Sequence, residues 1–116
     1  DKGGFINMPL TTAILFMDIA RADGRIDDRE VAASIEHLMA TFSLERSAAE
    51  ALIQRSFDVV GNGPGLRAYT DFLAQNTSPD ERRKLISSLR KIAKADESVD
   101  QYEILEIQNI AEMLGL

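Results

Sequence analysis

Several residue types are missing or scarce in this chain, and each absence narrows what the protein can do. The 116 residues include no Trp and no Cys. The absence of Cys excludes disulfides, thiolate nucleophiles and Cys-ligated zinc. A single His excludes a metal site built from several histidines of one chain. No apolar run approaches the roughly 20 residues that a membrane-spanning helix needs. The sequence therefore predicts no transmembrane segment, while peripheral association with a membrane remains open.

Positive charge is also in short supply. The chain has 13 Lys and Arg against 19 Asp and Glu, which gives a formal net charge of -6. Because nucleic-acid binding requires a basic surface, we predict no nucleic-acid partner. Apolar residues make up 45% and charged residues 28%, as in ordinary globular domains. We predict one helical domain over residues 8–116, preceded by an N-terminal tail or cloning remnant at residues 1–7.

The apolar residues follow a helical pattern along most of the chain. They recur at three- and four-residue spacing, and no useful stretch alternates with period two, so we predict an all-α fold. Short connections favour antiparallel neighbours. The expected architecture is a compact bundle of about six to seven helices, with helices near residues 9–22, 28–42, 47–60, 66–74, 79–93 and 101–114.

Helix starts are marked by capping residues. A Ser or Asp followed by Glu three positions later is typical of a capping box, and four such pairs occur in the sequence: Asp27 and Glu30, Ser47 and Glu50, Ser78 and Glu81, Asp100 and Glu103. The single histidine, His37, falls off the apolar stripe of its helix. We therefore predict that it is a surface residue rather than a ligand.

One stretch of the chain is repeated. Residues 19–31 and 92–104 are identical at six of thirteen positions. Each copy reads as a helix end, an acidic loop and the start of the next helix, so the bundle is expected to contain an internal helix–acidic loop–helix repeat. The shared acids follow the pattern Asp-x-x-x-Asp-x-x-Glu and are Asp23, Asp27 and Glu30 in the first copy and Asp96, Asp100 and Glu103 in the second.

Two interpretations of these six acids stay open. Capping explains four of them, because Asp27 with Glu30 and Asp100 with Glu103 form capping-box pairs. It does not explain Asp23 and Asp96, which lie at helix C-terminal ends, where the helix dipole disfavours a carboxylate. The alternative is a metal site in which two half-loops, each like the second half of an EF-hand loop, combine their oxygens. Such a site favours a divalent cation such as calcium, magnesium or manganese.

Basic residues gather in the fifth predicted helix. Six of the thirteen lie there or just after it: Arg82, Arg83, Lys84, Arg90, Lys91 and Lys94. A solvated face whose cations complement the helix dipole accounts for this cluster. The alternative is a docking strip for an acidic protein partner or a membrane surface.

Four motifs together resemble the TerB-like tellurite-resistance family. They are Ile-Ala-x-Ala-Asp-Gly-x-Ile-Asp-x-x-Glu at 19–30, Ser-Pro-Asp-Glu-Arg-Arg at 78–83, Ile-Ala-x-Ala-Asp-x-x-x-Asp-x-x-Glu at 92–103 and Ala-Glu-Met-Leu-Gly-Leu at 111–116. The resemblance spans about residues 10–116. One departure is Glu97, which stands where the second loop would have Gly.

The resemblance implies a compact helical domain with the six repeated acids as its metal ligands. It also implies a bacterial role in stress response or tellurite resistance, in the cytoplasm or peripheral to the inner membrane, with protein partners. We therefore expect a non-enzymatic interaction module that binds a divalent cation through the two loops. A metal-free interaction scaffold and a metal-dependent hydrolase are the alternatives. The sequence predicts neither the partner nor the oligomeric state.

Overall fold

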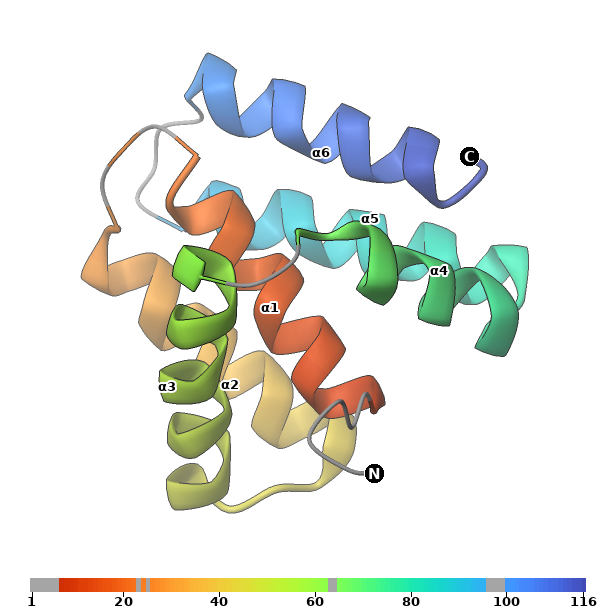
Figure 1. Ribbon diagram of the computed structural model, residues 1–116. Coiled ribbons are helices and arrows are strands. Elements are labelled where there is room, and N and C mark those ends of the chain that lie inside the picture. The colour runs from red at the N-terminus through yellow and green to blue at the C-terminus, as the bar shows by residue number, and fades with distance from the viewer. Residues whose placement is uncertain (1–6, 23, 25, 63–64, 96–99) are drawn as a thin grey trace.

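Helix α1, Met8–Ala20, lies at the centre of the fold and packs against each of the other five helices (Figure 1). The structure is a computed structural model that describes residues 7–22, 24, 26–62, 65–95 and 100–116. The helices around α1 are α2 (Asp28–Phe42), α3 (Arg46–Asn62), α4 (Arg67–Asn76), α5 (Pro79–Ala93) and α6 (Gln101–Met113). The described residues contain no strand, and the predicted all-α bundle is confirmed.

Capping residues set several helix starts as the sequence predicts. The Asn7 side chain accepts a hydrogen bond from the Leu10 backbone N–H at 2.9 Å, and Pro9 occupies the first turn of α1. Ser78 and Glu81 form a complete capping box at the start of α5. These side chains satisfy backbone N–H groups that have no partner inside the helix.

The start of α3 differs from the prediction. The helix begins at Arg46, so Ser47 lies inside the first turn and the predicted Ser47 cap is wrong. Within this turn, Arg46 and Glu50 form an exposed i,i+4 ion pair at 3.8 Å. Glu50, which the expected capping box required, therefore pairs with Arg46. This i,i+4 ion pair favours a helix that runs through Ser47.

The core forms around α1 because almost all of this helix is buried. Residues 10–17 are buried without a break, which is more than the broad apolar stripe that the sequence predicts, and includes Thr11 and Thr12. Each fully buried large apolar side chain stabilises the fold by roughly 1.5–3 kcal/mol. Large side chains with essentially no exposure include Phe16, Leu15, Met17, Ile19, Leu38, Leu73, Leu89 and Ile110. The same core also contains Ala49 and Ile53 of α3, so all six helices contribute to it.

His37 is more buried than expected. It is half-buried on α2, and its ring lies edge-to-face against Phe16 of α1, with 5.1 Å between the ring centroids. Burial, helped by the nearby Lys91 cation, lowers the pKa of His37. The prediction of a surface residue holds only in part, because the Phe16 ring of α1 contacts the imidazole while the side chain remains partly exposed.

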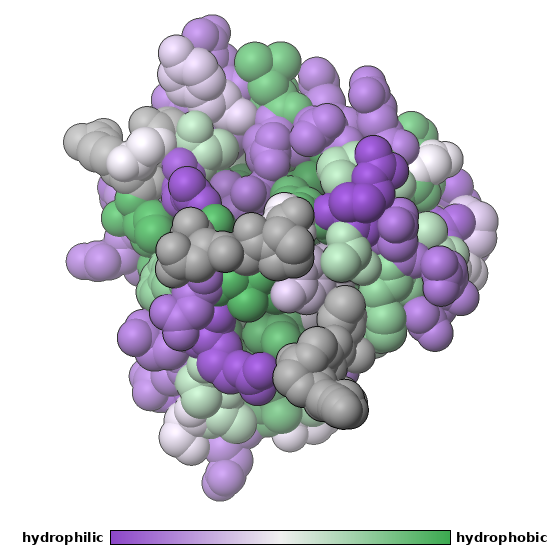
Figure 2. Space-filling view, in the orientation of Figure 1, coloured by the Kyte–Doolittle hydropathy of each residue, from purple (hydrophilic) through white to green (hydrophobic). Residues whose placement is uncertain are grey.

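The outside of the molecule is polar on the face shown in Figure 2. Hydrophilic side chains cover most of it, and hydrophobic ones show as separate areas among them. None of the described helices combines the length and apolar character needed to cross a lipid bilayer.

Candidate functional site

The two copies of the repeat come to the same side of the molecule. The C-terminal ends of α1 and α5 and the first turns of α2 and α6 lie toward the left of Figure 1. Helices α1 and α2 flank the first acidic loop, and α5 and α6 flank the second. Helix α1, which leads into the first acidic loop, packs against both α5 and α6, the helices that flank the second loop. The two copies of the repeat are therefore packed against one another.

The central aspartate of each copy caps a helix. The Asp27 carboxylate accepts a hydrogen bond from the Arg29 backbone N–H at 2.7 Å, and the Asp100 carboxylate accepts one from the Tyr102 backbone N–H, also at 2.7 Å. Asp27 also forms an ion pair with the Arg29 guanidinium, with Nε 3.2 Å from Oδ1. The hydrogen bond from this guanidinium and that from the Arg29 backbone lower the pKa of Asp27. In the first copy, therefore, an arginine already neutralises the capping carboxylate.

The glutamate of each copy is buried. Glu30 on α2 and Glu103 on α6 are each only 2% exposed, although Glu is rarely buried to this extent without partners. Glu103 completes the predicted capping box by accepting a hydrogen bond from the Asp100 backbone N–H at 3.4 Å. The two equivalent glutamates thus turn inward from equivalent first turns of two helices.

The remaining predicted ligands, Asp23 and Asp96, lie outside the described residues. Gly24, beside Asp23, has a φ of +91°, which is the conformation expected of a Gly that closes the first loop. Within the described part of the chain, no three acidic or histidine side chains gather closely enough to hold one metal ion. Of the four described acids, Asp27 caps α2 and Asp100 forms a capping box with Glu103 at α6, so these four alone do not form a metal centre.

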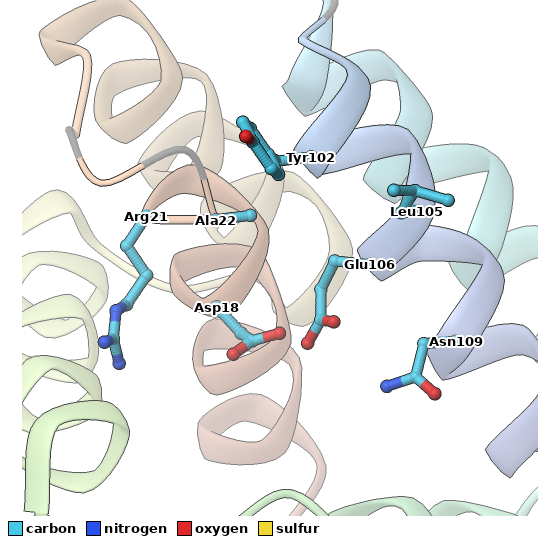
Figure 3. Close-up of a pocket in the computed structure, with 7 residues that line it drawn as sticks. All are labelled: Asp18, Arg21, Ala22, Tyr102, Leu105, Glu106 and Asn109. Carbon is cyan, nitrogen blue, oxygen red and sulfur yellow. The ribbon is translucent and has the colours of Figure 1, made fainter.

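A different pair of acids meets between α1 and α6. Figure 3 shows the Asp18 carboxyl of α1 and the Glu106 carboxyl of α6 pointing toward one another, in an arrangement in which hydrogen bonding to Glu106 raises the pKa of Asp18. They line an open cavity of about 550 Å³ together with Arg21, Ala22, Tyr102, Leu105 and Asn109. Within the described part of the chain, Oδ2 of Asp18 is buried with no hydrogen-bond partner.

The electrostatics of this pair are unusual. Burial raises the pKa of Asp18 to about 8, and the hydrogen bond and negative charge of Glu106 push it in the same direction. The positive charge of Arg21 opposes the shift more weakly, and its guanidinium donates a hydrogen bond to the Val60 carbonyl oxygen of α3 at 2.7 Å. Asp18 therefore holds a proton near neutral pH.

Sequence reasoning missed this pair. The signal for Asp18 was present, since it is the only charged residue in the 13 residues of α1 and stands between the apolar Met17 and Ile19. No comparable signal marks Glu106, which is one of several acids in the C-terminal helix. The partner lies 88 positions further along the chain, and only the packing of α6 on α1 brings the two together.

The basic cluster divides into separate roles. Arg82 is half-buried and donates hydrogen bonds to the Thr77 and Ala74 carbonyl oxygens at 2.7 and 3.1 Å, which ties α5 to the end of α4. Arg83 pairs with Asp80 in the first turn of α5. Exposed cations without such a structural role in α5 and its C-cap are Lys84, Arg90, Lys91 and Lys94. Two of these, Arg90 and Lys94, line a cavity of about 240 Å³ with Ile104 and Ile107 of α6.

The family of the chain is indicated by comparison with family models. The model described as "Tellurite resistance protein TerB" matches residues 9–116, which includes every helix except the first residue of α1. No curated protein and no solved structure matches the chain.

Proposed function

The chain belongs to the TerB family of tellurite-resistance proteins, and on this basis we propose that it is a divalent-cation-binding interaction module. In this proposal the two acidic loops bind the ion together, with Asp23 and Asp96 as its main ligands and Asp27 and Asp100 as sources of further oxygens. Calcium, magnesium and manganese are the expected ions because all the available ligand atoms are oxygens.

The observation that supports the proposal most is the matched burial of Glu30 and Glu103. Each is 2% exposed in the first turn of the helix that follows an acidic loop. A carboxylate is stabilised at a helix N-terminus, so these glutamates anchor the helix starts and hold the loops in position. They act as supports for the loops, while the ion itself binds to residues nearer the loop centres.

The two loops are expected to contribute unequally. In the first, the Asp27 carboxylate is already paired with Arg29, and an ion would have to displace that guanidinium to reach it. In the second, Asp100 forms its capping box with Glu103 and makes no ion pair with another described residue. We therefore assign the larger share of the binding free energy to the second loop.

Calorimetric titration of the intact chain with calcium, magnesium and manganese chlorides tests the proposal. We expect binding heat and a raised melting temperature with at least one ion, both lost in Asp96→Asn and reduced in Asp23→Asn. The matched control is Asp71→Asn, which removes one exposed carboxylate from α4, away from the loops. Absence of heat and of any melting shift at millimolar concentrations of all three ions would refute metal binding.

A second function is favoured by the groove between α5 and α6. It is lined by the Arg90 and Lys94 cations and by Ile104 and Ile107, of which Ile104 is 42% exposed and Ile107 is buried. Cations beside apolar side chains suit an acidic amphipathic segment of a protein partner. Such a metal-free scaffold would keep its partner after Asp96→Asn and lose it after Arg90→Glu with Lys94→Glu.

We propose no catalytic role, and we place the domain in the bacterial cytoplasm, free or peripheral to the inner membrane. The family and the absence of Cys support this location, since a Cys-free chain is suited to a reducing compartment. A substrate screen with added manganese addresses the metal-dependent hydrolase alternative. Hydrolysis that is abolished by both Asp23→Asn and Asp96→Asn would replace the interaction module with an enzyme.

A further inference from the structure

The contact between Asp18 and Glu106 is independent of the acidic loops and joins two helices that are distant in sequence. We propose that this pair is a pH-sensitive clasp, which holds α6 on α1 while Asp18 carries a proton and loosens the contact when the proton is lost. The proposal does not rest on metal binding, and each can fail without the other.

The geometry requires a proton in the contact. Two ionised carboxyl groups offer only acceptor oxygens, so they can neither hydrogen-bond nor attract one another. Oδ2 of Asp18 is buried, and no hydrogen-bond donor among the described residues reaches it. A proton on Asp18 provides the missing donor, and the Glu106 carboxyl facing it accepts the hydrogen bond (Figure 3).

The surroundings offer little positive charge that could stabilise an ionised Asp18 in place of its proton. Among the described residues, Arg21 is the only cation that lines the cavity, and its guanidinium donates a hydrogen bond to the Val60 carbonyl oxygen of α3 at 2.7 Å. The other titratable group there is the Tyr102 phenol, and Asn109 adds a neutral amide. In the part of the chain that the structure describes, α2, α3, α4 and α5 contribute no charged side chain to this cavity. Met17 and Ile19, on either side of Asp18, are fully buried.

The pH window follows from the raised pKa of Asp18. The folded value is about 8 and the reference value is 3.8, so the folded state binds the proton more tightly than the unfolded state. The stability that the proton provides is complete below pH 3.8 and decreases as the pH rises toward 8. Above about 8 it is lost, and two negative charges then face each other between α1 and α6.

The loosened element is α6 rather than the whole fold. Helix α6 also packs against α5 and α4, and its Ile107 and Ile110 remain in the core. Loss of the proton therefore weakens the contact of α6 with α1 but leaves its contacts with α4 and α5. The residues nearest the clasp on α6, Tyr102 and Leu105, are already 56% and 59% exposed. The cavity they line is expected to widen on the alkaline side of neutrality.

Urea unfolding of wild type and Asp18→Asn between pH 5.5 and pH 9 tests the clasp. An Asn amide can donate to Glu106 as a protonated acid does, but it does not titrate in this range. We expect the urea midpoint of the wild type to fall steadily across this range. The midpoint of Asp18→Asn should stay nearly constant and exceed that of the wild type at pH 9.

Asp71→Asn is the matched control, because it makes the same chemical change at an exposed position of α4. It should follow the pH dependence of the wild type. A pH dependence in Asp18→Asn equal to that of the wild type would overturn the proposal.

A second measurement applies even if Asp18→Asn does not fold. The carboxyl ¹³C resonance of Asp18, followed by NMR in the wild-type protein, should titrate with a midpoint near 8. In Glu106→Gln the midpoint should fall, because the variant removes the negative charge beside Asp18. A wild-type midpoint near 4 would refute the clasp. So would a stabilisation by calcium at pH 9 that disappears in Asp18→Asn, since a metal ion would then hold the pair.

Discussion

The first turns of α2 and α6 share the same sequence pattern but are stabilised in different ways. At α6, Asp100 and Glu103 form a reciprocal capping box. At α2, Asp27 accepts from the Arg29 backbone and also pairs with the Arg29 guanidinium. The residue two positions after the capping aspartate explains the contrast. In the first copy Arg29 follows Asp27 by two residues, and the matching residue of the second copy is the aromatic Tyr102.

The difference shows that a repeated motif can preserve a shape without preserving its interactions. Both helices start at the same point of the pattern, and both glutamates are buried to the same 2%. The interactions of the two aspartates differ, because only Asp27 has a cationic side chain, Arg29, as a partner among the described residues. A metal ion at the two loops would therefore meet one aspartate held by a cation and one held by a backbone hydrogen bond.

The largest effect is expected from the buried glutamate of the second copy. Glu103→Ala removes the acceptor for the Asp100 backbone N–H and leaves a void behind the helix start. Loss of a partner in a buried hydrogen bond costs roughly 1–3 kcal/mol. The free energy of unfolding from urea titration should fall by this amount. Glu112→Ala, at an exposed position of the same helix, should change it by less than about 0.5 kcal/mol. Equal effects of the two variants would contradict the assigned role of Glu103.

A smaller effect is expected at the cap of α6. Asp100→Ala removes the acceptor for the Tyr102 backbone N–H, and loss of an N-cap side chain typically costs about 1 kcal/mol. Asn caps helices about as well as Asp, so Asp100→Asn should remain close to wild type. Thermal unfolding monitored by circular dichroism compares the two. A comparable loss in both variants would mean that the charge of Asp100, rather than its capping bond, stabilises α6.

The smallest effect is expected from the ion pair of the first copy. Arg29 lowers the pKa of Asp27 through its side chain, so Arg29→Ala should raise the Asp27 midpoint toward 3.8 in an NMR titration. The sign for stability follows from the lowered value. The pair stabilises the fold above the unfolded pKa of Asp27, and this contribution is lost as the pH falls through the folded pKa. An unchanged Asp27 midpoint in Arg29→Ala would remove the proposed contrast between the two copies.

Much of the architecture could be predicted from the sequence because its signals are local. Apolar spacing and the caps at Asn7, Ser78 and Asp100 correctly predict six helices. The spacing rules fail where tertiary packing decides. Ser47 carries a capping signature, yet α3 begins at Arg46. His37 lies off the apolar stripe, yet Phe16 covers its ring.

The candidate site was less predictable for the same reason. The repeat points to Glu30 and Glu103, but their burial depends on how α2 and α6 pack. The clasp needs Asp18 and Glu106 from opposite ends of the chain, and no local pattern links them. Asp23 and Asp96, on which the metal hypothesis depends, lie outside the described residues, so their role as ligands stays a prediction.

The central position of α1 has a consequence for how the protein can come apart. Every other helix packs on α1, so its buried amides between Leu10 and Met17 should exchange with solvent deuterium only when the whole domain opens. The same arrangement means that the two copies of the repeat cannot act as separate folding units. A fragment made of α5 and α6 would lack α1, against which both helices pack. The sequence is duplicated internally, but the whole domain is the unit that folds cooperatively.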